Sequence, residues 1–384
     1  MKFIVSRTAL DAVLQHLVRA IASKNSLPIL ECFVFELAEE VLTIHASDGE
    51  NRITGKVKVS SHDGEGTFAI AARLLNERLS NLPEQPLTFD VSEENKLLTI
   101  TYSSGIHTLP WQDGENFPSQ ITLKEDCVRF SLPTEKLLFG ISSTAFAVST
   151  DEFRPVMNGT YFDITEGTVT LVASDGRKLA RTILSGVDIQ EQHANFNLPP
   201  KPALLLKNVL AKIAGNLFIE FDAQRAVFTL KTPLENGEGT IDAYRIEARL
   251  LEGKYPNYNS VIPVDNPYRL ILNHSNLLRA LRNVTLSADA QNKMVKLTID
   301  AGKLRMDTKN DELGQVSYET VECEYEGPHI DINFNGYFFL ETLNSVFAEN
   351  LELQIGDSSR AAIVKPVEQE ENVDQTVLMM PIIA

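Results

Sequence analysis

Three aspartates stand in similar turn-like segments along the chain, and carboxylates are side chains that can hold metal ions for hydrolysis. Asp48 lies in H-A-S-D-G-E-N, Asp175 in V-A-S-D-G-R-K-L-A, and Asp311 in M-D-T-K-N-D-E-L. Metal-dependent hydrolysis needs several carboxylates or histidines that converge on one point. Because these aspartates are spread one to each repeat of the chain, the pattern argues against a nuclease-type centre.

Other arrangements with catalytic or metal-binding chemistry are missing from the sequence. It contains no H-E-x-x-H, G-x-x-x-x-G-K-[ST] or G-x-S-x-G segment. The seven histidines are scattered, and the three cysteines, Cys32, Cys127 and Cys323, form no C-x-x-C pair. Isolated thiols are typical of the reducing cytoplasm. We therefore expect a cytoplasmic protein that is not an enzyme and needs no cofactor or metal.

The segment from Val172 to Ala180 predicts a strand that runs into a tight turn, since Asp-Gly tolerates the reversal of the chain. Its near copy contains Asp48, which precedes Asp175 by 127 residues (175 − 48). The second copy is basic, because Arg177 and Lys178 stand where the first has Glu50 and Asn51. A repeated turn with one electrically distinct copy indicates a specialised surface.

The turn belongs to a longer repeat. Residues 3–17, 130–144 and a segment that begins at Leu270 each combine a short alternating strand, a polar helix start and an apolar helical stripe. The predicted helix starts are Ser6, Thr134 and Ser275. A second strand–helix unit begins at Phe68, Phe196 and Ile332, and strand pairs follow at 86–109, 216–244 and 350–382. Units of this length are whole domains rather than solenoid repeats.

These repeats predict an α+β fold of three similar domains, each with two helices packed on antiparallel sheets. The expected boundaries give domains over 1–128, 129–266 and 267–384, the last boundary being marked by Pro263 and Pro267. The chain of 384 residues suits this division. Its longest apolar runs are too short for a membrane span, and it starts without a signal peptide.

The net charge of −17 argues at first against a nucleic-acid partner, because proteins held on DNA by counterion release are usually basic. The middle third is the least acidic, with 14 basic and 16 acidic residues, against 11 and 18 in the first and 10 and 18 in the last. Basic residues fall on the predicted helices, and many acidic residues on strands and turns. The first helix is expected to present Arg7, Asp11, Gln15 and Arg19 outward. The pattern indicates a two-faced protein that is able to contact phosphates non-specifically.

Over nearly its full length the sequence resembles the bacterial sliding clamp, the beta subunit of DNA polymerase III. The matching segments are M-K-F-I-V at the start, S-L-P-I-L at 26–30, M-N-G at 157–159, S-D-G-R-K-L-A at 174–180, Y-P-N-Y at 255–258 and M-P-I near the end. No single segment is decisive, but their order and spacing are specific.

The resemblance implies a clamp-type, ring-forming fold: a head-to-tail homodimer that encircles duplex DNA with its helices inside. It implies a processivity factor of replication that slides on DNA without sequence preference. The implied protein partners are the replicative polymerase, the clamp loader, and other clamp-binding proteins of repair and replication control, with no membrane partner. A ring that holds DNA by topology can be acidic overall.

The resemblance also implies a hydrophobic pocket between the second and third domains for short peptides of these partners. The positions that match it are Met157, Ser174, Gly176, Arg177, Lys178, Leu179, Pro256, Val261, Leu378, Met379, Met380, Pro381 and Ile382. We expect Arg177 and Lys178 to rim the pocket, and alternate residues of 376–383 to line it. Arg177-Lys178, Ser260 and the I-I-A tail depart from the family pattern, which leaves partner preference open.

For DNA contact, the matching positions are Lys24, Arg73, Arg154 and Lys201, of which Lys24 and Lys201 are expected in flexible loops beside helix starts. At the subunit seam, Ile106 should face Leu286. Two other classes of protein remain as alternatives, an enzyme and a monomeric repeat scaffold that never touches DNA.

Overall fold

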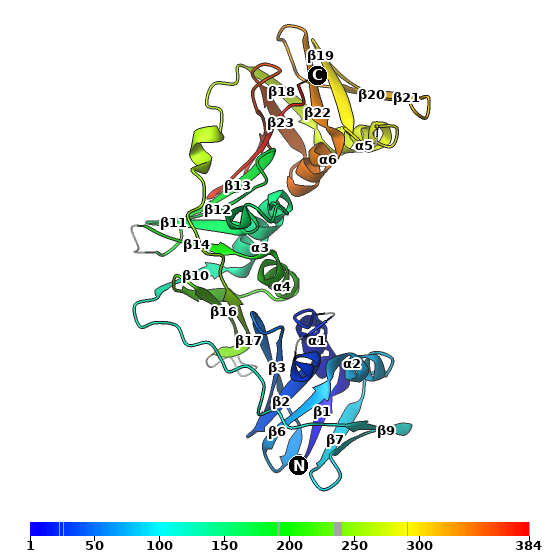
Figure 1. The fold of residues 1–384 in the computed structure, drawn as a ribbon, viewed down its shortest axis with the longest axis vertical. Helices are drawn as coiled ribbons and strands as arrows, with labels where there is room; N and C mark the ends of the chain where they lie inside the picture. The colour runs from blue at the N-terminus through cyan, green and yellow to red at the C-terminus, as the bar shows by residue number, and fades with distance from the viewer. Residues whose placement is uncertain (23, 26, 190–192, 234–239, 290, 384) are drawn as a thin grey trace. The chain divides into compact units, whose positions relative to one another are not determined.

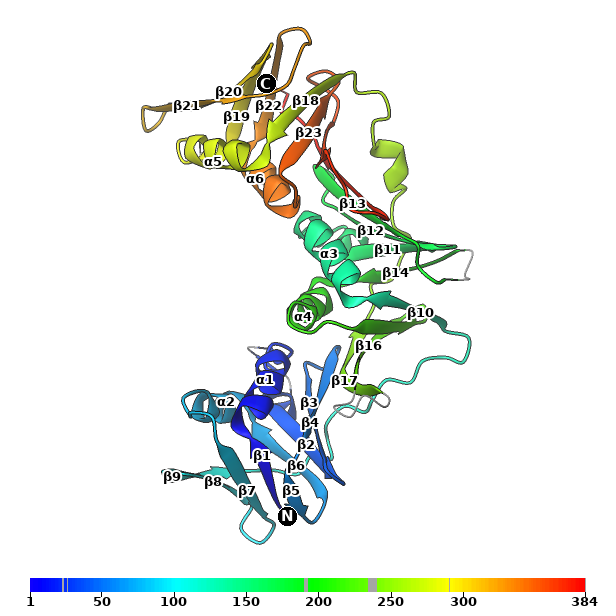
Figure 2. The same cartoon turned by 180° about the vertical axis from the view of Figure 1, so that it is seen from behind.

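The computed structural model describes residues 1–22, 24–25, 27–189, 193–233, 240–289 and 291–383 (Figures 1 and 2). Of the segments quoted above, Ser26 and Ala384 therefore lie outside the described residues. Two compact units make up the chain, one of residues 1–138 and 201–250, the other of 139–200 and 251–384. The central third is thus divided between the units, and each unit is described by itself.

Six α-helices are described, two in each third of the sequence, as the repeats predict. They are α1 (Arg7–Leu17), α2 (Ala72–Ser80), α3 (Thr134–Thr144), α4 (Pro200–Leu210), α5 (His274–Thr285) and α6 (Gly336–Ser345). Short 3-10 turns cover η1 (Pro28–Glu31), η2 (Ala145–Ala147), η3 (Pro155–Met157) and η4 (Tyr258–Val261). The predicted start at Ser6 is confirmed, because its hydroxyl accepts from the Ala9 amide. The start at Ser275 is wrong by two residues, since Asn273 caps α5 through the Asn276 amide.

The first unit contains a five-stranded and an eight-stranded antiparallel sheet. The first, in spatial order, is β5 (Ser61–Asp63), β1 (Lys2–Ser6), β7 (Pro86–Ser92), β8 (Leu97–Tyr102) and β9 (Gly105–Pro110). The second is β10 (Val128–Pro133), β15 (Asn216–Phe221), β16 (Arg225–Pro233), β17 (Thr240–Arg249), β4 (Arg52–Lys58), β3 (Val41–Ser47), β2 (Cys32–Ala38) and β6 (Gly66–Ala71).

The second unit repeats this plan with an eight-stranded and a four-stranded sheet. The larger sheet is β14 (His193–Leu198), β11 (Thr160–Thr165), β12 (Thr168–Ser174), β13 (Lys178–Ser185), β25 (Val373–Met379), β24 (Ala362–Pro366), β23 (Asn350–Ile355) and β18 (Tyr268–Asn273). The smaller is β21 (Gln315–Glu322), β20 (Lys303–Asn310), β19 (Met294–Asp300) and β22 (Ile330–Asn335). An α+β fold with antiparallel sheets is confirmed, but each second helix is followed by three strands rather than the predicted pair.

Each eight-stranded sheet crosses a predicted domain boundary. In the first, β4 pairs with β17, so that Arg52 lies opposite Glu247. In the second, β13 pairs with β25, so that Leu179 lies opposite Leu378. In both sheets the strand that follows the repeated Asp-Gly turn is therefore joined to the last strand of the next repeat.

The helices pack on the sheets through the apolar stripes seen in the sequence. In α1 the buried residues include Leu10, Val13, Leu14 and Leu17, which recur at spacings of three and four. The helix lies close to β4 at Gly55, where an added Cβ would stand 2.5 Å from Val13 Cγ1. A larger residue at Gly55 would therefore push α1 off the sheet.

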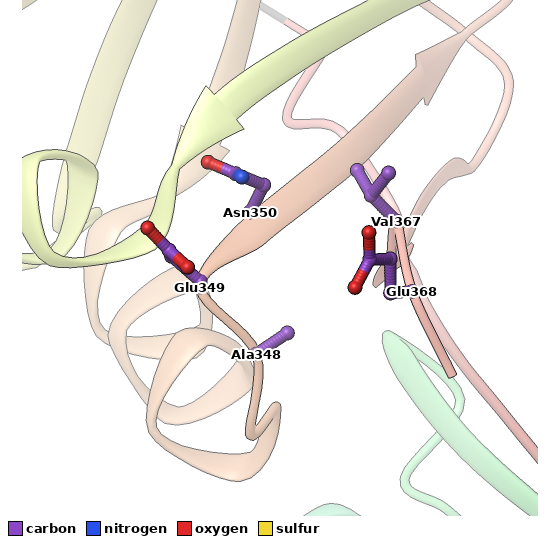
Figure 3. Close-up of a pocket in the computed structure, with 5 residues that line it drawn as sticks. All are labelled: Ala348, Glu349, Asn350, Val367 and Glu368. Atoms are coloured by element: carbon purple, nitrogen blue, oxygen red, sulfur yellow. The ribbon is translucent and has the colours of Figure 1, made fainter. Parts of the chain in front are cut away.

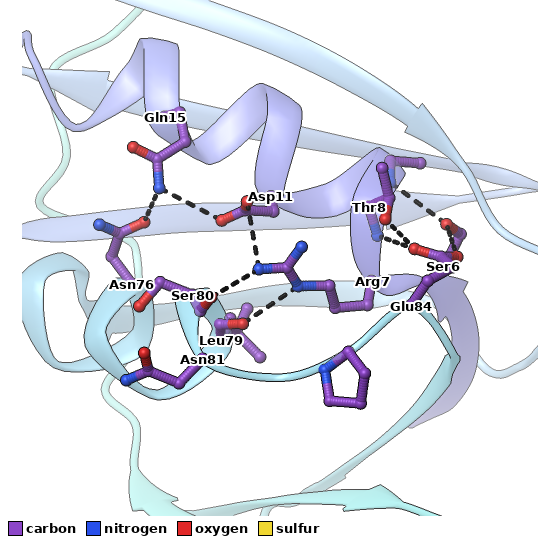
Figure 4. A network of polar contacts seen from close by, with 12 residues as sticks. Ser6, Arg7, Thr8, Asp11, Gln15, Asn76, Leu79, Ser80, Asn81 and Glu84 are labelled. Carbon is purple, nitrogen blue, oxygen red and sulfur yellow. Dashed lines mark hydrogen bonds and ion pairs between the residues drawn. The ribbon is translucent and has the colours of Figure 1, made fainter.

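The polar face of α1 does not lie open as expected. Arg7 donates from Nε to the Leu79 carbonyl (3.1 Å) and from Nη2 to the Ser80 carbonyl (2.8 Å), at the C-terminal end of α2 (Figure 4). Gln15 donates to Asp11 (3.2 Å) and to Asn76 of α2 (3.1 Å). A cation is favourable at a helix C-terminus, because the carbonyls there lack intrahelical partners. These side chains join the two helices, and only Arg19 of the predicted set is exposed.

Candidate functional site at the repeated turn

The two Asp-Gly turns have the same hydrogen bonds. Ser174 Oγ accepts from the Gly176 amide (3.1 Å) and donates to the Lys178 carbonyl (2.9 Å). Asp175 Oδ1 accepts from the amides of Arg177 (2.8 Å) and Lys178 (2.9 Å), and Gly176 has φ +87°. In the first copy, Ser47, Asp48 and Gly49 make the corresponding bonds, and Gly49 has φ +94°. The S-D-G sequence therefore specifies the turn locally, as predicted.

On one face of the second large sheet, apolar side chains gather beside this turn. The buried members are Val172, Leu179, Tyr255, Ala361 and Leu378, with Val156, Tyr161, Tyr258 and Ile262 packed against them. We call this set the junction cluster. Tyr161 and Tyr255 stack with ring centroids 4.5 Å apart, and Tyr258 donates its hydroxyl proton to Asp163 (2.7 Å). Burial raises the pKa of Tyr161 to about 12, so its hydroxyl stays neutral.

Several candidate pocket residues surround the junction cluster and remain accessible. Pro256, Val261 and Met380 are exposed, while Pro381 and Ile382 are half-buried. The amide of Met380 donates to the Arg177 carbonyl (2.8 Å), which extends the pairing of β13 with β25 toward the chain end. Of the other candidate pocket residues, Met157 in η3 and Ser174 in the turn are buried, and Gly176 is exposed.

Lys178 and Met379 lie on the opposite face of the sheet from Leu179 and Leu378, because side chains alternate along a strand. Met379 belongs to the core of the last third rather than to the junction cluster. The expectation that Lys178 rims an open pocket is wrong, since its relative exposure is only 5%. Its ammonium lies 2.7 Å from Glu341 Oε2 and 3.3 Å from Asp175 Oδ2, and 4.3 Å from the centre of the Phe338 ring. Both carboxylates balance the buried charge.

A hollow of about 500 Å³ opens on the Lys178 face. Its lining residues are Phe146, Val148, Ser149, Thr150, Asp151, Arg154, Asp175, Arg177, Lys178, Phe338 and Glu341. Arg177 is the one residue of the predicted charged rim that is exposed, and it forms no ion pair with a described residue. The candidate set is therefore divided by the sheet into an apolar side and a charged side.

The first copy of the turn has a different side-chain set on the same backbone. We call the pairing of β4 with β17 the first joint and the pairing of β13 with β25 the second joint. In the first joint Arg52 takes the register position that Leu179 has in the second, and it lies opposite Glu247 instead of Leu378. Glu247 is buried and binds Arg245 (2.8 Å) and the Ile121 amide (2.9 Å). Charged groups thus fill the first joint where apolar ones fill the second. Of the two pairings, that of β13 with β25 therefore has apolar side chains at the matched register positions.

His45 occupies the position in the first joint that Val172 occupies in the second. Burial, with smaller contributions from Arg52 and Lys56, lowers the pKa of His45 from 6.5 to about 3. Its Nδ1 lies 2.9 Å from Thr54 Oγ1. The imidazole is therefore neutral at physiological pH and helps to fill the joint.

The four residues matched to DNA contacts differ in their surroundings. Arg73 is exposed on α2, and Lys24 is exposed in the loop between α1 and η1. Lys201 is in the first turn of α4, and its Nζ lies 2.6 Å from Asp48 Oδ2. Arg154 binds Asp151 Oδ2 (2.8 Å) and the Asp175 carbonyl (3.3 Å). The expectation of a flexible loop at Lys201 is therefore wrong.

The two residues matched to the subunit seam are both strongly exposed. Ile106 is 62% exposed on β9, and Leu286, which follows α5, is 84% exposed. Val316 and Tyr318 of β21 are also exposed, and Ser317 bonds to Ser287 beside Leu286 (2.7 Å). Both strands end their sheets, which leaves one side of each without a strand partner among the described residues.

Two other hollows contain no predicted residue. One of about 270 Å³ is lined by Ala348, Glu349, Asn350, Val367 and Glu368 (Figure 3). The other, of about 680 Å³, is lined by Arg269, Ala301, Gly302, Cys323, Glu324, Tyr325 and Glu326. Within the described part of the chain, no group of three or more His, Cys, Asp or Glu side chains could hold a metal ion, and no helix is long and apolar enough to cross a membrane.

Three family models match consecutive parts of the sequence. They are the N-terminal, central and C-terminal domains of the DNA polymerase III beta subunit, over residues 1–122, 131–257 and 259–382. The chain belongs to this family of bacterial sliding clamps. It is a processivity factor of DNA replication and a non-catalytic subunit of DNA polymerase III.

Relatives and solved structures agree with this membership along the whole chain. The beta sliding clamp of Halalkalibacterium halodurans is 27% identical and covers 97% of this chain and 98% of its own length. That of Pseudomonas aeruginosa is 24% identical, with 99% of each chain covered. A structure of the P. aeruginosa clamp bound to griselimycin matches with a TM-score of 0.90 at 23% identity, covering 100% of both chains. The clamp fold is thus common to chains that share about a quarter of their residues.

Sequence reasoning missed several residues of this clamp site. Glu341 and Phe338, which hold Lys178, lie more than 150 residues further along the chain, a separation of 163 for Glu341. Tyr161 and Tyr258 of the junction cluster were also missed. Tyr161 of β11 lies opposite Val172 of β12 in a hairpin, so the alternation of side chains along these two strands could have placed it on the same face. No local signal points to Glu341.

Proposed function

We propose that two copies of this clamp close head to tail into a cytoplasmic ring that encircles duplex DNA. The ring would tether the replicative polymerase, the clamp loader and other clamp-binding proteins through short peptides. The main support for this proposal is a pattern of strand pairing. The described strands form two joints between consecutive repeats, and the two edge strands that could form a third joint are not paired with each other.

In both joints the strand after the repeated turn pairs with the last strand of the following repeat, β4 with β17 and β13 with β25. The third such strand is β21, which follows the turn at 311–314, and it pairs only with β20 among the described strands. The remaining last strand is β9, which pairs only with β8. Since one chain supplies both halves, β21 of one copy and β9 of another would complete the pattern.

The exposed residues on these edges support such pairing. Ile106 on β9 and Val316 and Tyr318 on β21 are apolar side chains on open strand edges, which would otherwise favour aggregation. Leu286 lies beside β21 through the Ser287–Ser317 bond. We therefore retain the proposal that Ile106 and Leu286 meet at the seam.

Cations on the helices support a DNA-facing surface. Exposed basic residues on or just after the helices that form no ion pair with a described residue are Arg19, Arg73, Arg78, Lys207, Lys212, Arg279 and Arg282. Such groups suffice for non-specific phosphate contacts, with no reading of bases. Of the residues matched to DNA contacts, Lys24 and Arg73 are the ones left for this role. Lys201 and Arg154 are engaged within the protein.

The junction cluster supports peptide binding. Apolar side chains at Val261 and Met380 are exposed next to a buried floor that includes Leu179 and Leu378. Methionine suits a surface that accepts different partners, because its side chain repacks easily. The structure of a relative with griselimycin bound is further support for a ligand site in this family.

Retention on circular DNA tests the ring. The clamp is loaded by its clamp loader on nicked circular DNA, and the DNA is then linearised in high salt. A closed ring should stay on the circle and slide off the linear form. Equal, salt-sensitive retention on both forms would contradict a topological hold, and a monomer mass in light scattering would contradict the dimer.

A further inference from the structure

Phe153 is the most exposed aromatic side chain among the described residues, with a relative exposure of 95%. It lies in the loop between η2 and η3, next to Arg154. Single exposed apolar residues are normal on protein surfaces, so exposure alone has no functional meaning. The way the loop is held gives Phe153 its significance.

A closed set of hydrogen bonds fixes the loop around Phe153. Asp151 Oδ1 accepts from the Phe153 amide (3.0 Å), and Asp151 Oδ2 accepts from Arg154 Nε (2.8 Å). The Asp151 amide donates to Ser149 Oγ (3.1 Å), and the Ser149 amide donates to the Met157 carbonyl (3.1 Å). The backbone is thus held in one conformation that presents the ring to solvent. An interface that buried this ring would not have to order the loop first.

The same loop is attached to the candidate peptide site at both of its ends. Arg154 donates to the Asp175 carbonyl of the repeated turn, and Arg154 and Asp151 line the hollow on the Lys178 face. Three residues after Phe153, Val156 packs against the junction cluster, and the next residue, Met157, is buried. The exposed ring is therefore continuous with the surface to which the partner peptide is proposed to bind.

The charges around Phe153 favour a protein partner over DNA. Glu152 is exposed and forms no ion pair with a described residue. Of the cations that line the hollow beside this loop, Arg154 and Lys178 are paired with carboxylates, and Arg177 is exposed without an ion pair to a described residue. Phosphates would be repelled by the unpaired Glu152 next to Phe153 in the chain, whereas a protein with an apolar recess and charges of both signs around it would complement Phe153, Glu152 and Arg177 together.

We propose that Phe153 is a second anchor for partner proteins, which inserts into the folded body of the polymerase while the polymerase's peptide occupies the junction cluster. This inference rests on the proposed peptide site and extends it. Aromatic residues that become fully buried are frequent hot spots of protein interfaces, where truncation costs about tenfold or more in affinity. The contact lies outside the peptide, so the peptide alone should not use it.

Phe153→Ala separates the two contacts, and Val264→Ala is the matched control. Val264 is 99% exposed in the same unit and is an apolar side chain on the segment between β17 and β18. Each variant is titrated with a synthetic clamp-binding peptide and with the full-length catalytic subunit of the replicative polymerase. We expect Phe153→Ala to bind the peptide as wild type does and the polymerase about tenfold more weakly. Val264→Ala should match wild type in both titrations.

Other outcomes overturn the inference. Polymerase affinity of Phe153→Ala within twofold of wild type would remove the anchor, and an equal loss with the peptide would make Phe153 part of the peptide site instead. A shorter lifetime of Phe153→Ala on nicked circular DNA without polymerase would identify a DNA contact. If wild type bound the polymerase but not the peptide, the peptide site would fail while the Phe153 comparison still stood. If wild type bound neither, both proposals would fail.

Discussion

Lys178 and Leu179 are neighbours in β13, yet their side chains serve opposite faces of one sheet. Leu179 packs in the junction cluster opposite Leu378, and Lys178 lies 2.7 Å from Glu341 on the other face. Strand β13, which supplies Leu179 to the candidate peptide site, is therefore held on its opposite face by an ion pair with Glu341 of α6. Stability of the junction and binding at its surface should respond to different substitutions.

Glu341→Gln should lower the free energy of unfolding by about 1–3 kcal/mol, because it leaves the buried Lys178 ammonium with a weaker partner. Urea unfolding followed by circular dichroism measures the change. Glu349→Gln is the control, since Glu349 is exposed and forms no ion pair with a described residue. Equal stabilities of the two variants would mean that Asp175 alone suffices to balance Lys178.

Val261→Asp should weaken binding of a clamp-binding peptide at least about tenfold, because it places a charge at the edge of an apolar site. Val261 is exposed, so the melting temperature should stay near that of wild type. Isothermal titration measures the affinity, with Val264→Asp as the control for an added charge on the same segment.

Removal of residues 380–384 should also abolish binding of the peptide and leave the dimer intact. Normal peptide binding by Val261→Asp or by the truncated protein would refute the assigned site.

The repeated turn and the helices were predictable from sequence because their determinants are local. Ser174, Asp175 and Gly176 bond within a few residues of one another, and the apolar stripe of α1 is contiguous. The register of strands across a domain boundary has no such local signal. Neither the pairing of Leu179 with Leu378 nor that of Arg52 with Glu247 could be read from the repeats.

Charged residues were the least predictable part of the site. Arg7, Lys178 and Lys201 were expected to face solvent or a ligand, because charged side chains usually do. Each instead bonds to a partner that is distant in sequence: the α2 carbonyls, Glu341 and Asp48. Since such partners come together only in the folded chain, the residue type alone could not assign these roles.

Asp48→Asn should lower stability at neutral pH by about 1–3 kcal/mol, through loss of the charged contact with Lys201. Burial raises the pKa of Asp48, but hydrogen bonds from Lys201 and the turn amides outweigh burial and hold this pKa below its usual 3.8. A depressed carboxyl pKa stabilises the fold above pH 3.8, and this contribution disappears as the pH falls through the lower folded value. The two unfolding curves should therefore converge in acid. A difference between them that does not change with pH would show that the charge of Asp48 is irrelevant.

His45→Gln should flatten the pH dependence of stability between pH 6.5 and 3. The folded pKa of about 3 lies below the ordinary 6.5, so the unfolded chain takes up a proton first as the pH falls. Wild type should lose up to about 1.4 kcal/mol per pH unit from this group in that range, with full stability restored above 6.5. Denaturant titrations at successive pH values measure the slope. Parallel curves for the two proteins would mean that His45 takes up its proton in the folded chain at the same pH as in the unfolded chain.

Ile106→Glu and Tyr318→Glu should each dissociate the proposed dimer, because both place a carboxylate on an edge strand expected to pair with another copy. The two positions lie in different units, on β9 and β21. Both side chains have a relative exposure of 62%, so neither variant should unfold. Analytical ultracentrifugation should record a dimer for wild type and mostly monomer for each variant. Lys substitutions provide the sharper test. If β9 meets β21 across the seam, Ile106→Lys mixed with Tyr318→Glu should form a mixed dimer, since opposite charges across paired strands attract and like charges repel. Dimers that survive every substitution would place the contact between copies on another surface.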